Sequence, residues 1–184
     1  SGLAFLFILL YMWVKIGNLK HYIKANIFTM LGLLLNILFF FWYNNKYYLG
    51  IKNQGYTSQI FSSWLSPFPV SFLGVWFSPS KGILTYSPVF LFSFIGFYIS
   101  MRKGWKENSQ YLIYFLIVIS HTLIISFWKH WYGGYSFGYR MSSDIIPYLI
   151  LLIVPFVKSQ IFEKYQTVFV WLIVISVLVQ IFGM

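Results

Sequence analysis

Six runs of apolar residues, separated by short polar segments, dominate the pattern of this chain. They extend over residues 3–14, 25–43, 83–101, 111–128, 145–157 and 167–182. A helix that crosses the roughly 30 Å hydrocarbon layer of a membrane needs about 20 mainly apolar residues. The second, third and fourth runs have this length, and the short fifth run can extend into its flanks. The pattern therefore predicts an all-α, polytopic transmembrane helix bundle of about six helices, in a single domain over residues 1–184.

Two apolar stretches do not fit a simple span. The first run is too short to cross the membrane, and neither a basic segment before it nor a cleavage site after it indicates a signal peptide. We interpret it as part of a truncated helix, so we expect the chain to belong to a longer protein. Residues 56–77 are also largely apolar, but Pro67 and Pro69 interrupt them. This segment is predicted to be interfacial or re-entrant.

The composition supports a lipid environment. Hydrophobic residues make up 59% of the chain and charged residues only 9%, against about 25% charged residues in soluble domains. The net charge of +10 comes from Lys and Arg scattered between apolar runs, which is typical of membrane topology and not of a nucleic-acid-binding surface. The chain has no cysteine, so it holds no information about redox compartment.

The basic residues predict an orientation. Segments 15–24, 102–110 and 158–166 hold eight Lys and Arg in 28 positions, whereas segments 44–82 and 129–144 hold five in 55. Because cytoplasmic loops are enriched in basic residues, the first set is predicted to face the cytoplasm and the second set the outside. We expect an integral protein of the bacterial cytoplasmic (inner) membrane.

Two outward segments hold candidate binding residues. In the first, Lys81 stands before the third run, where it and the backbone amides of residues 82–85 are positioned to contact a lipid phosphate. In the second, Gly133 and Gly134 permit unusual turns, His130 lies next to this loop, and Arg140 offers a guanidinium that suits phosphate oxygens. An ordinary interfacial lysine and a snorkelling arginine remain open as alternatives.

Acidic residues are few. Asp144 is a candidate general base, but its position before Ile145-Ile146-Pro147 is better explained by helix capping. Glu107 and Glu163 fall in segments predicted to be cytoplasmic surface. No paired carboxylates and no metal-ligand cluster occur on the outward side, so no cofactor is identified, and a divalent metal stays possible for a longer protein.

Polar residues also occur inside the apolar runs. His121 lies within the fourth run and Asn36 within the second. Ionisable residues at membrane depth are functional candidates. With no acidic partner at similar depth, we expect both side chains to be neutral and hydrogen-bonded to a neighbouring helix.

The two outward segments resemble the late helices of bacterial polytopic glycosyltransferases of the C type, relatives of the dolichyl-phosphate-mannose protein mannosyltransferases. The matching residues are Ser78, Pro79, Gly82, Ile83, Tyr86, Ser87, Pro88, Trp131, Gly133, Gly134, Ser136, Gly138, Arg140 and Pro147. They cover less than a quarter of the chain. Tyr139 stands where relatives often have proline.

The resemblance implies an enzyme that takes a sugar from a polyprenyl-phosphate carrier at the outer face of the membrane. It assigns a phosphate-binding role to Arg140 and Lys81, and it places the catalytic acid on an earlier outward loop that has no counterpart here. The partners are then the lipid bilayer and the lipid-linked sugar donor. A transporter or flippase for a lipid-linked anion, and a non-catalytic membrane scaffold, are the alternatives.

Overall fold

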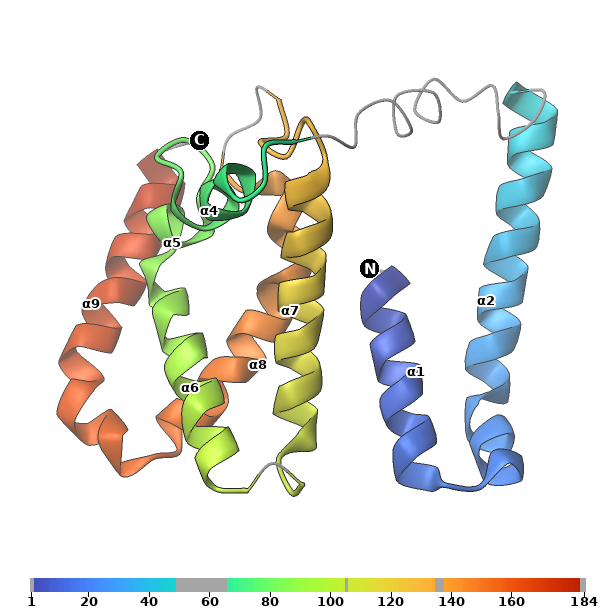
Figure 1. Ribbon diagram of the computed structural model, residues 1–184, viewed down its shortest axis with the longest axis horizontal. Coiled ribbons are helices and arrows are strands. Elements are labelled where there is room, and N and C mark those ends of the chain that lie inside the picture. The colour runs from blue at the N-terminus through green and yellow to red at the C-terminus, as the bar shows by residue number, and fades with distance from the viewer. Residues whose placement is uncertain (1, 49–65, 105, 135–137, 183–184) are drawn as a thin grey trace. The chain divides into compact units, whose positions relative to one another are not determined.

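The computed structural model describes residues 2–48, 66–104, 106–134 and 138–182, and every regular element in these ranges is a helix. The chain divides into two compact units. One consists of residues 8–65, and the other of residues 66–184 together with the first seven residues. Figure 1 shows the helices of each unit.

The first two helices form a hairpin. They are α1 (Gly2–Ile16) and α2 (Leu19–Tyr48), and the smaller unit holds α2 and the part of α1 from residue 8 onward. Gly17, with a φ of 64°, ends α1 by donating its amide to Trp13 O at 3.0 Å, an αL cap that glycine adopts without strain. The turn is stabilised further by Trp13 and Tyr22, whose rings meet edge to face at 5.2 Å.

The larger unit holds the remaining elements, four of which run side by side (Figure 1). They are α6, α7, α8 and α9, while α4 lies across one end of this group. In chain order the elements are α4 (Val70–Phe77), α5 (Ile83–Tyr86), the 3-10 turn η2 (Pro88–Phe90), α6 (Leu91–Arg102), α7 (Ser109–Phe127), the 3-10 turn η3 (Arg140–Ile145), α8 (Ile146–Val157) and α9 (Gln160–Phe182).

The closest helix pair is α6 and α8. Gly96 of α6 lies directly against Leu152 O, in space that a Cβ atom would occupy. One turn earlier, Ser93 Oγ donates to Leu149 O at 2.8 Å. Small residues allow helices to approach in this way where lipid provides no hydrophobic drive for association. The ring of Phe156, fully buried, packs on Phe92 at 4.4 Å and completes the contact.

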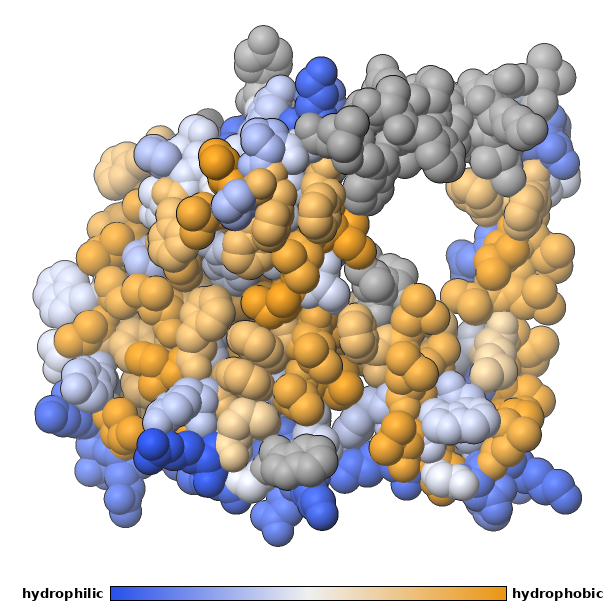
Figure 2. Space-filling view, in the orientation of Figure 1, coloured by the Kyte–Doolittle hydropathy of each residue, from blue (hydrophilic) through white to orange (hydrophobic). Residues whose placement is uncertain are grey.

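Many large hydrophobic side chains are exposed on the helices. Figure 2 shows hydrophobic residues over the helix surfaces and hydrophilic residues mainly towards the helix ends. Within the described residues, four helical segments are long and apolar enough to cross a membrane: Asn26–Tyr48, Ser109–Phe127, Arg140–Val157 and Gln160–Phe182. Residues 4–16 and 88–102 form shorter apolar helices. The chain is thus an all-helical integral membrane protein, but the expected count of about six spans is not confirmed.

The third predicted span is broken near one end. The chain leaves the helix at Ser87 (φ −143°, ψ 72°) and resumes with Pro88 at the first position of η2. Proline removes one intrahelical hydrogen bond and clashes with the preceding turn, so the sequence predicts a kink at Pro88. The structure confirms an interruption there, and it is larger than a kink. Val89 N at the break donates to Ser176 Oγ of α9 at 3.4 Å.

The segments between the spans are shorter than the sequence indicates. Helix α2 already begins at Leu19 and α9 at Gln160, so Lys20, Lys24 and Lys164 lie in the first two turns of helices and not in loops. Of the predicted interfacial or re-entrant segment, residues 56–65 lie outside the described residues. Its remainder forms the short helix α4.

Candidate functional site

Helix α4 is fixed to the end of α7 by a polar and an aromatic contact. Ser71 Oγ donates to Ser126 O at 2.6 Å, and both serines are fully buried. The ring of Phe68 stacks on Phe127 at 5.1 Å. Since the last turn of a helix leaves carbonyl groups without intrahelical partners, the serine hydroxyl satisfies one of them while it anchors α4.

A tight turn after α4 presents Lys81. The amides of Lys81 and Gly82 both donate to Ser78 O, at 3.3 and 2.7 Å. A Cβ atom on Gly82 would lie only 2.6 Å from Ser78 N and 2.7 Å from Phe77 C, so glycine is required here for space. The sequence predicts that the Gly82 amide contacts an anion. This amide already has a partner within the turn, so it is not available for that contact. Helix α5 is a single turn, so its dipole at this point is small.

The second stretch of the site follows α7. Trp131 N donates to Trp128 O at 3.1 Å and Gly133 N to His130 O at 2.9 Å, and Gly133 and Gly134 have φ values of 69° and 71°. These positive φ values confirm the prediction that the two glycines permit a turn that other residues rarely adopt. His130 is exposed, and its Nδ1 lies 3.3 Å from the hydroxyl of Tyr132.

The two stretches meet at an open pocket of about 510 Å³. The ring of Trp131 lies against Gly74 of α4, in space that a Cβ atom would occupy, and this contact seats the second stretch beside the first. The pocket is lined by Ser78, Ser80, Lys81, Trp131, Tyr132 and Gly134. An ammonium group, hydroxyl groups and aromatic rings therefore converge, a combination suited to a ligand with both an anionic and an apolar part.

Arg140 and Asp144 lie on η3, and neither lines this pocket. Both side chains are exposed. Helix α8 begins at Ile146 with Ile145 at the N-cap position and without a side-chain cap, so the interpretation of Asp144 as the N-cap is wrong. The physical reason is that the backbone is already helical through η3, which moves the start of the helical segment upstream of Asp144.

Tyr139 connects the two stretches through hydrogen bonds. Its hydroxyl lies 2.9 Å from Ser87 Oγ, at the break before η2, and accepts from Gln180 Nε2 of α9 at 3.5 Å. Its ring meets Tyr86 edge to face at 6.3 Å. In the sequence, Tyr139 stands out only as a departure from the resembled pattern. Gln180, a polar residue inside an otherwise apolar run, was a signal that could have revealed this network.

Other candidate residues have local roles in the described structure. His121 Nε2 lies 3.3 Å from Met141 O on η3, which agrees with the expected bond to a neighbouring element and requires a proton on Nε2. Asn36 instead donates to Gly32 O of its own helix at 2.8 Å, so the expected bond to another helix is wrong there. Ser136 of the resembled motif lies outside the described residues.

Within the described ranges, no group of three His, Asp or Glu residues could hold a metal ion. Models of protein families, curated proteins and solved structures were each compared with this chain, and none matches it.

Proposed function

We propose that this chain is part of a membrane glycosyltransferase and binds a polyprenyl-phosphate-linked sugar donor at the outer face of the membrane. One observation carries the proposal. The two stretches that resemble the C-type glycosyltransferases, some 50 residues apart in sequence, line a single pocket, to which one contributes Lys81 and the other Trp131.

The position of the pocket supports an outward-facing site. It lies at the end of the larger unit where α4 and α5 are found, whereas the α6–α7 and α8–α9 turns lie at the other end (Figure 1). Those two turns and their flanks hold Arg102, Lys103, Lys106, Lys158 and Lys164. Under the positive-inside rule the basic end is cytoplasmic, and the pocket then opens outward.

The chain itself offers few groups for the chemical step. Glycosyl transfer to a hydroxyl needs a group that accepts its proton. The three acidic residues of the chain are Glu107, Asp144 and Glu163. Glu107 and Glu163 belong to the basic end, so only Asp144 on η3 is a candidate base. Because the resemblance places the catalytic acid on an earlier outward loop, we expect the chain alone to bind donor without transferring sugar.

A transporter or flippase for a lipid-linked anion is the second candidate. The break between α5 and η2 favours it, because discontinuous helices are common at transporter binding sites. However, this break lies near one end of the span, whereas transporter sites lie near the bilayer midplane, and no internal repeat is evident in the sequence.

The test is donor binding by the chain reconstituted in lipid vesicles. Lys81→Gln should weaken binding of a labelled polyprenyl-phosphate sugar about tenfold, since a hydrogen bond to a charged group contributes about 1.5–3 kcal/mol. Lys129→Gln is the matched control, because Lys129 is exposed on the neighbouring turn but does not line the pocket. Equal effects of the two substitutions would contradict the proposal.

Further measurements test the roles of Arg140 and Asp144 and separate the two candidate functions. Arg140→Ala should weaken binding more than Arg140→Lys if the guanidinium contacts the phosphate. Sugar transfer by the chain, abolished in Asp144→Asn, would identify Asp144 as the base against our expectation. Movement of labelled donor between leaflets without transfer would favour the flippase.

A further inference from the structure

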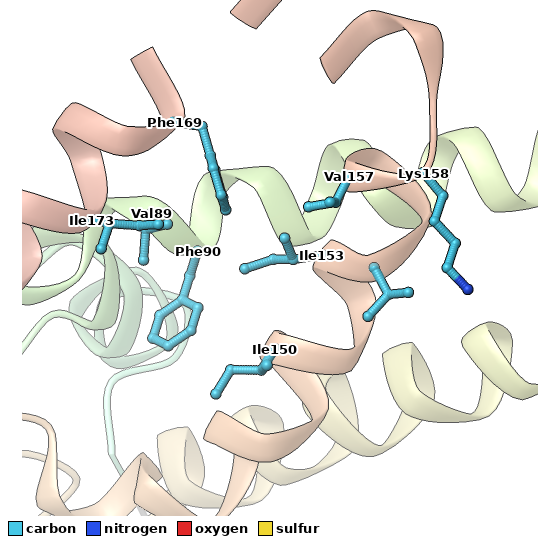
Figure 3. Close-up of a pocket in the computed structure, with 9 residues that line it drawn as sticks. Val89, Phe90, Ile150, Ile153, Val157, Lys158, Phe169 and Ile173 are labelled. Atoms are coloured by element: carbon cyan, nitrogen blue, oxygen red, sulfur yellow. The ribbon is translucent and has the colours of Figure 1, made fainter. Parts of the chain in front are cut away.

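A second hollow lies between η2, α8 and α9, away from the site described above (Figure 3). One wall is a single face of α8, formed by Ile150, Ile153, Val154 and Val157, which follow the i, i+3, i+4, i+7 spacing of a helix face. Its volume is about 480 Å³. We refer to it as the α8–α9 groove.

The opposite wall and the two ends of the groove differ in character. Phe169 and Ile173, one turn apart on α9, form the opposite wall, and Phe90 of η2 lies towards one end. Lys158 marks the other end, just after the last residue of α8. The groove is therefore apolar along its length and cationic at one end only.

The length of the groove matches one leaflet of a membrane. Ile150 and Lys158 are eight residues apart, which corresponds to about 12 Å along a helix. Half of the hydrocarbon layer measures about 15 Å. A lipid chain in the groove would thus extend through most of one leaflet, with its headgroup near Lys158.

The lining of the groove suits a lipid chain. Apart from Lys158 at one end, its walls are formed by apolar side chains. An acyl chain is apolar and flexible, and it needs no hydrogen-bond partners.

The charge at the mouth selects the headgroup. Lys158 is exposed. Arg102, Lys103, Lys106 and Lys164 belong to the same end of the unit, against only Glu107 and Glu163. A basic residue beside the headgroup attracts anionic lipid by about 1 kcal/mol, and Lys158 is the basic residue that lines the groove.

We propose that the α8–α9 groove is a binding site for one anionic phospholipid, with an acyl chain between α8 and α9 and the phosphate at Lys158. The lipid comes from the leaflet at the basic end of the unit. The proposal does not depend on the glycosyltransferase function, because that site lies at the other end.

The headgroup part is tested by lipid titration of the purified chain in detergent, with bound lipids counted by native mass spectrometry. Dioleoyl-phosphatidylglycerol should bind about fivefold more tightly than dioleoyl-phosphatidylcholine, which has the same chains. Lys158→Gln should abolish this preference. Lys103→Gln, an exposed lysine that does not line the groove, should keep it. Equal binding of the two lipids by the unchanged protein, or the same loss in both variants, would overturn the proposal.

The chain part is tested by filling the groove. Val154→Trp should weaken the first binding step for both lipids, whereas Leu151→Trp, on the same helix but outside the groove, should not. Glycerol phosphate without acyl chains should not bind, which excludes a simple phosphate site. Unchanged lipid binding in a folded Val154→Trp protein would mean that the groove is empty or covered by another protein segment, and the proposal would fail.

Discussion

At the scale of single residues, small side chains decide how closely the elements of the larger unit approach. The ring of Trp131 packs against Gly74, the backbone of the preceding turn against Gly82, and Leu152 O against Gly96, each in space that a Cβ atom would need. None of these three glycines has a positive φ, so each is needed for space and not for conformational freedom. Two of them position the walls of the candidate pocket.

Gly82→Ala is therefore expected to lower stability. The added Cβ would meet backbone atoms of Phe77 and Ser78 at 2.6–2.7 Å, and backbone cannot move aside as a flexible side chain can. Overpacking of this kind costs about 1–3 kcal/mol, which should lower the melting temperature of the purified protein. Gly32→Ala is the control, because a Cβ there meets nothing within 4 Å and alanine favours a helix by about 0.5–1 kcal/mol. Similar melting temperatures for both variants would show that the turn is not tightly packed.

At the scale of elements, α6 and α8 form the centre of the larger unit. Their contact combines the missing Cβ of Gly96, the hydrogen bond from Ser93 and the buried ring of Phe156. Helix α9, by contrast, is exposed along most of its length and meets the break at η2 through Ser176. A tightly packed pair beside a loosely packed helix accounts for a groove between α8 and α9.

Gly96→Val should separate α6 from α8. The branched side chain has no space beside Leu152 O, so the helices must move apart, at an expected cost of about 1–3 kcal/mol. Ile95→Val, at a position of the same helix that is 40% exposed, should have a much smaller effect. Thermal unfolding in detergent measures both. A Gly96→Val protein as stable as the control would contradict this packing.

At the scale of the whole molecule, polar groups gather at the ends of the helices and apolar groups cover their length (Figure 2). The candidate pocket and the basic turns lie at opposite ends of the larger unit (Figure 1). Charged groups lie near the ends of the helices because they are costly within the hydrocarbon layer. This arrangement also places the two proposed binding sites near different membrane surfaces.

The topology is tested by cysteine labelling, for which the absence of native cysteine is convenient. Lys129→Cys and Lys103→Cys introduce single thiols at exposed positions of opposite ends. In intact cells, an impermeant maleimide should label Lys129→Cys and leave Lys103→Cys unlabelled until the membrane is opened. The reverse pattern would place the pocket on the cytoplasmic side and end the proposed function.

The sequence by itself determined the helical class of the chain and its apolar environment, although not the number of spans. Long runs of apolar residues with few charges define membrane helices because lipid leaves the backbone no partners outside the helix. The break at Pro88 also followed from local chemistry, since proline lacks the amide that a helix needs.

Only the tertiary structure decided which side chains come together. The sequence predicts Lys81, Gly134 and Arg140 as binding residues in two outward segments. In the structure Lys81 and Gly134 line one pocket, whereas Arg140 does not. The network around Tyr139 joins Ser87 and Gln180, residues far apart in sequence. The α8–α9 groove is lined by residues of η2, α8 and α9, and the apolar periodicity of a single helix does not reveal which elements will lie together.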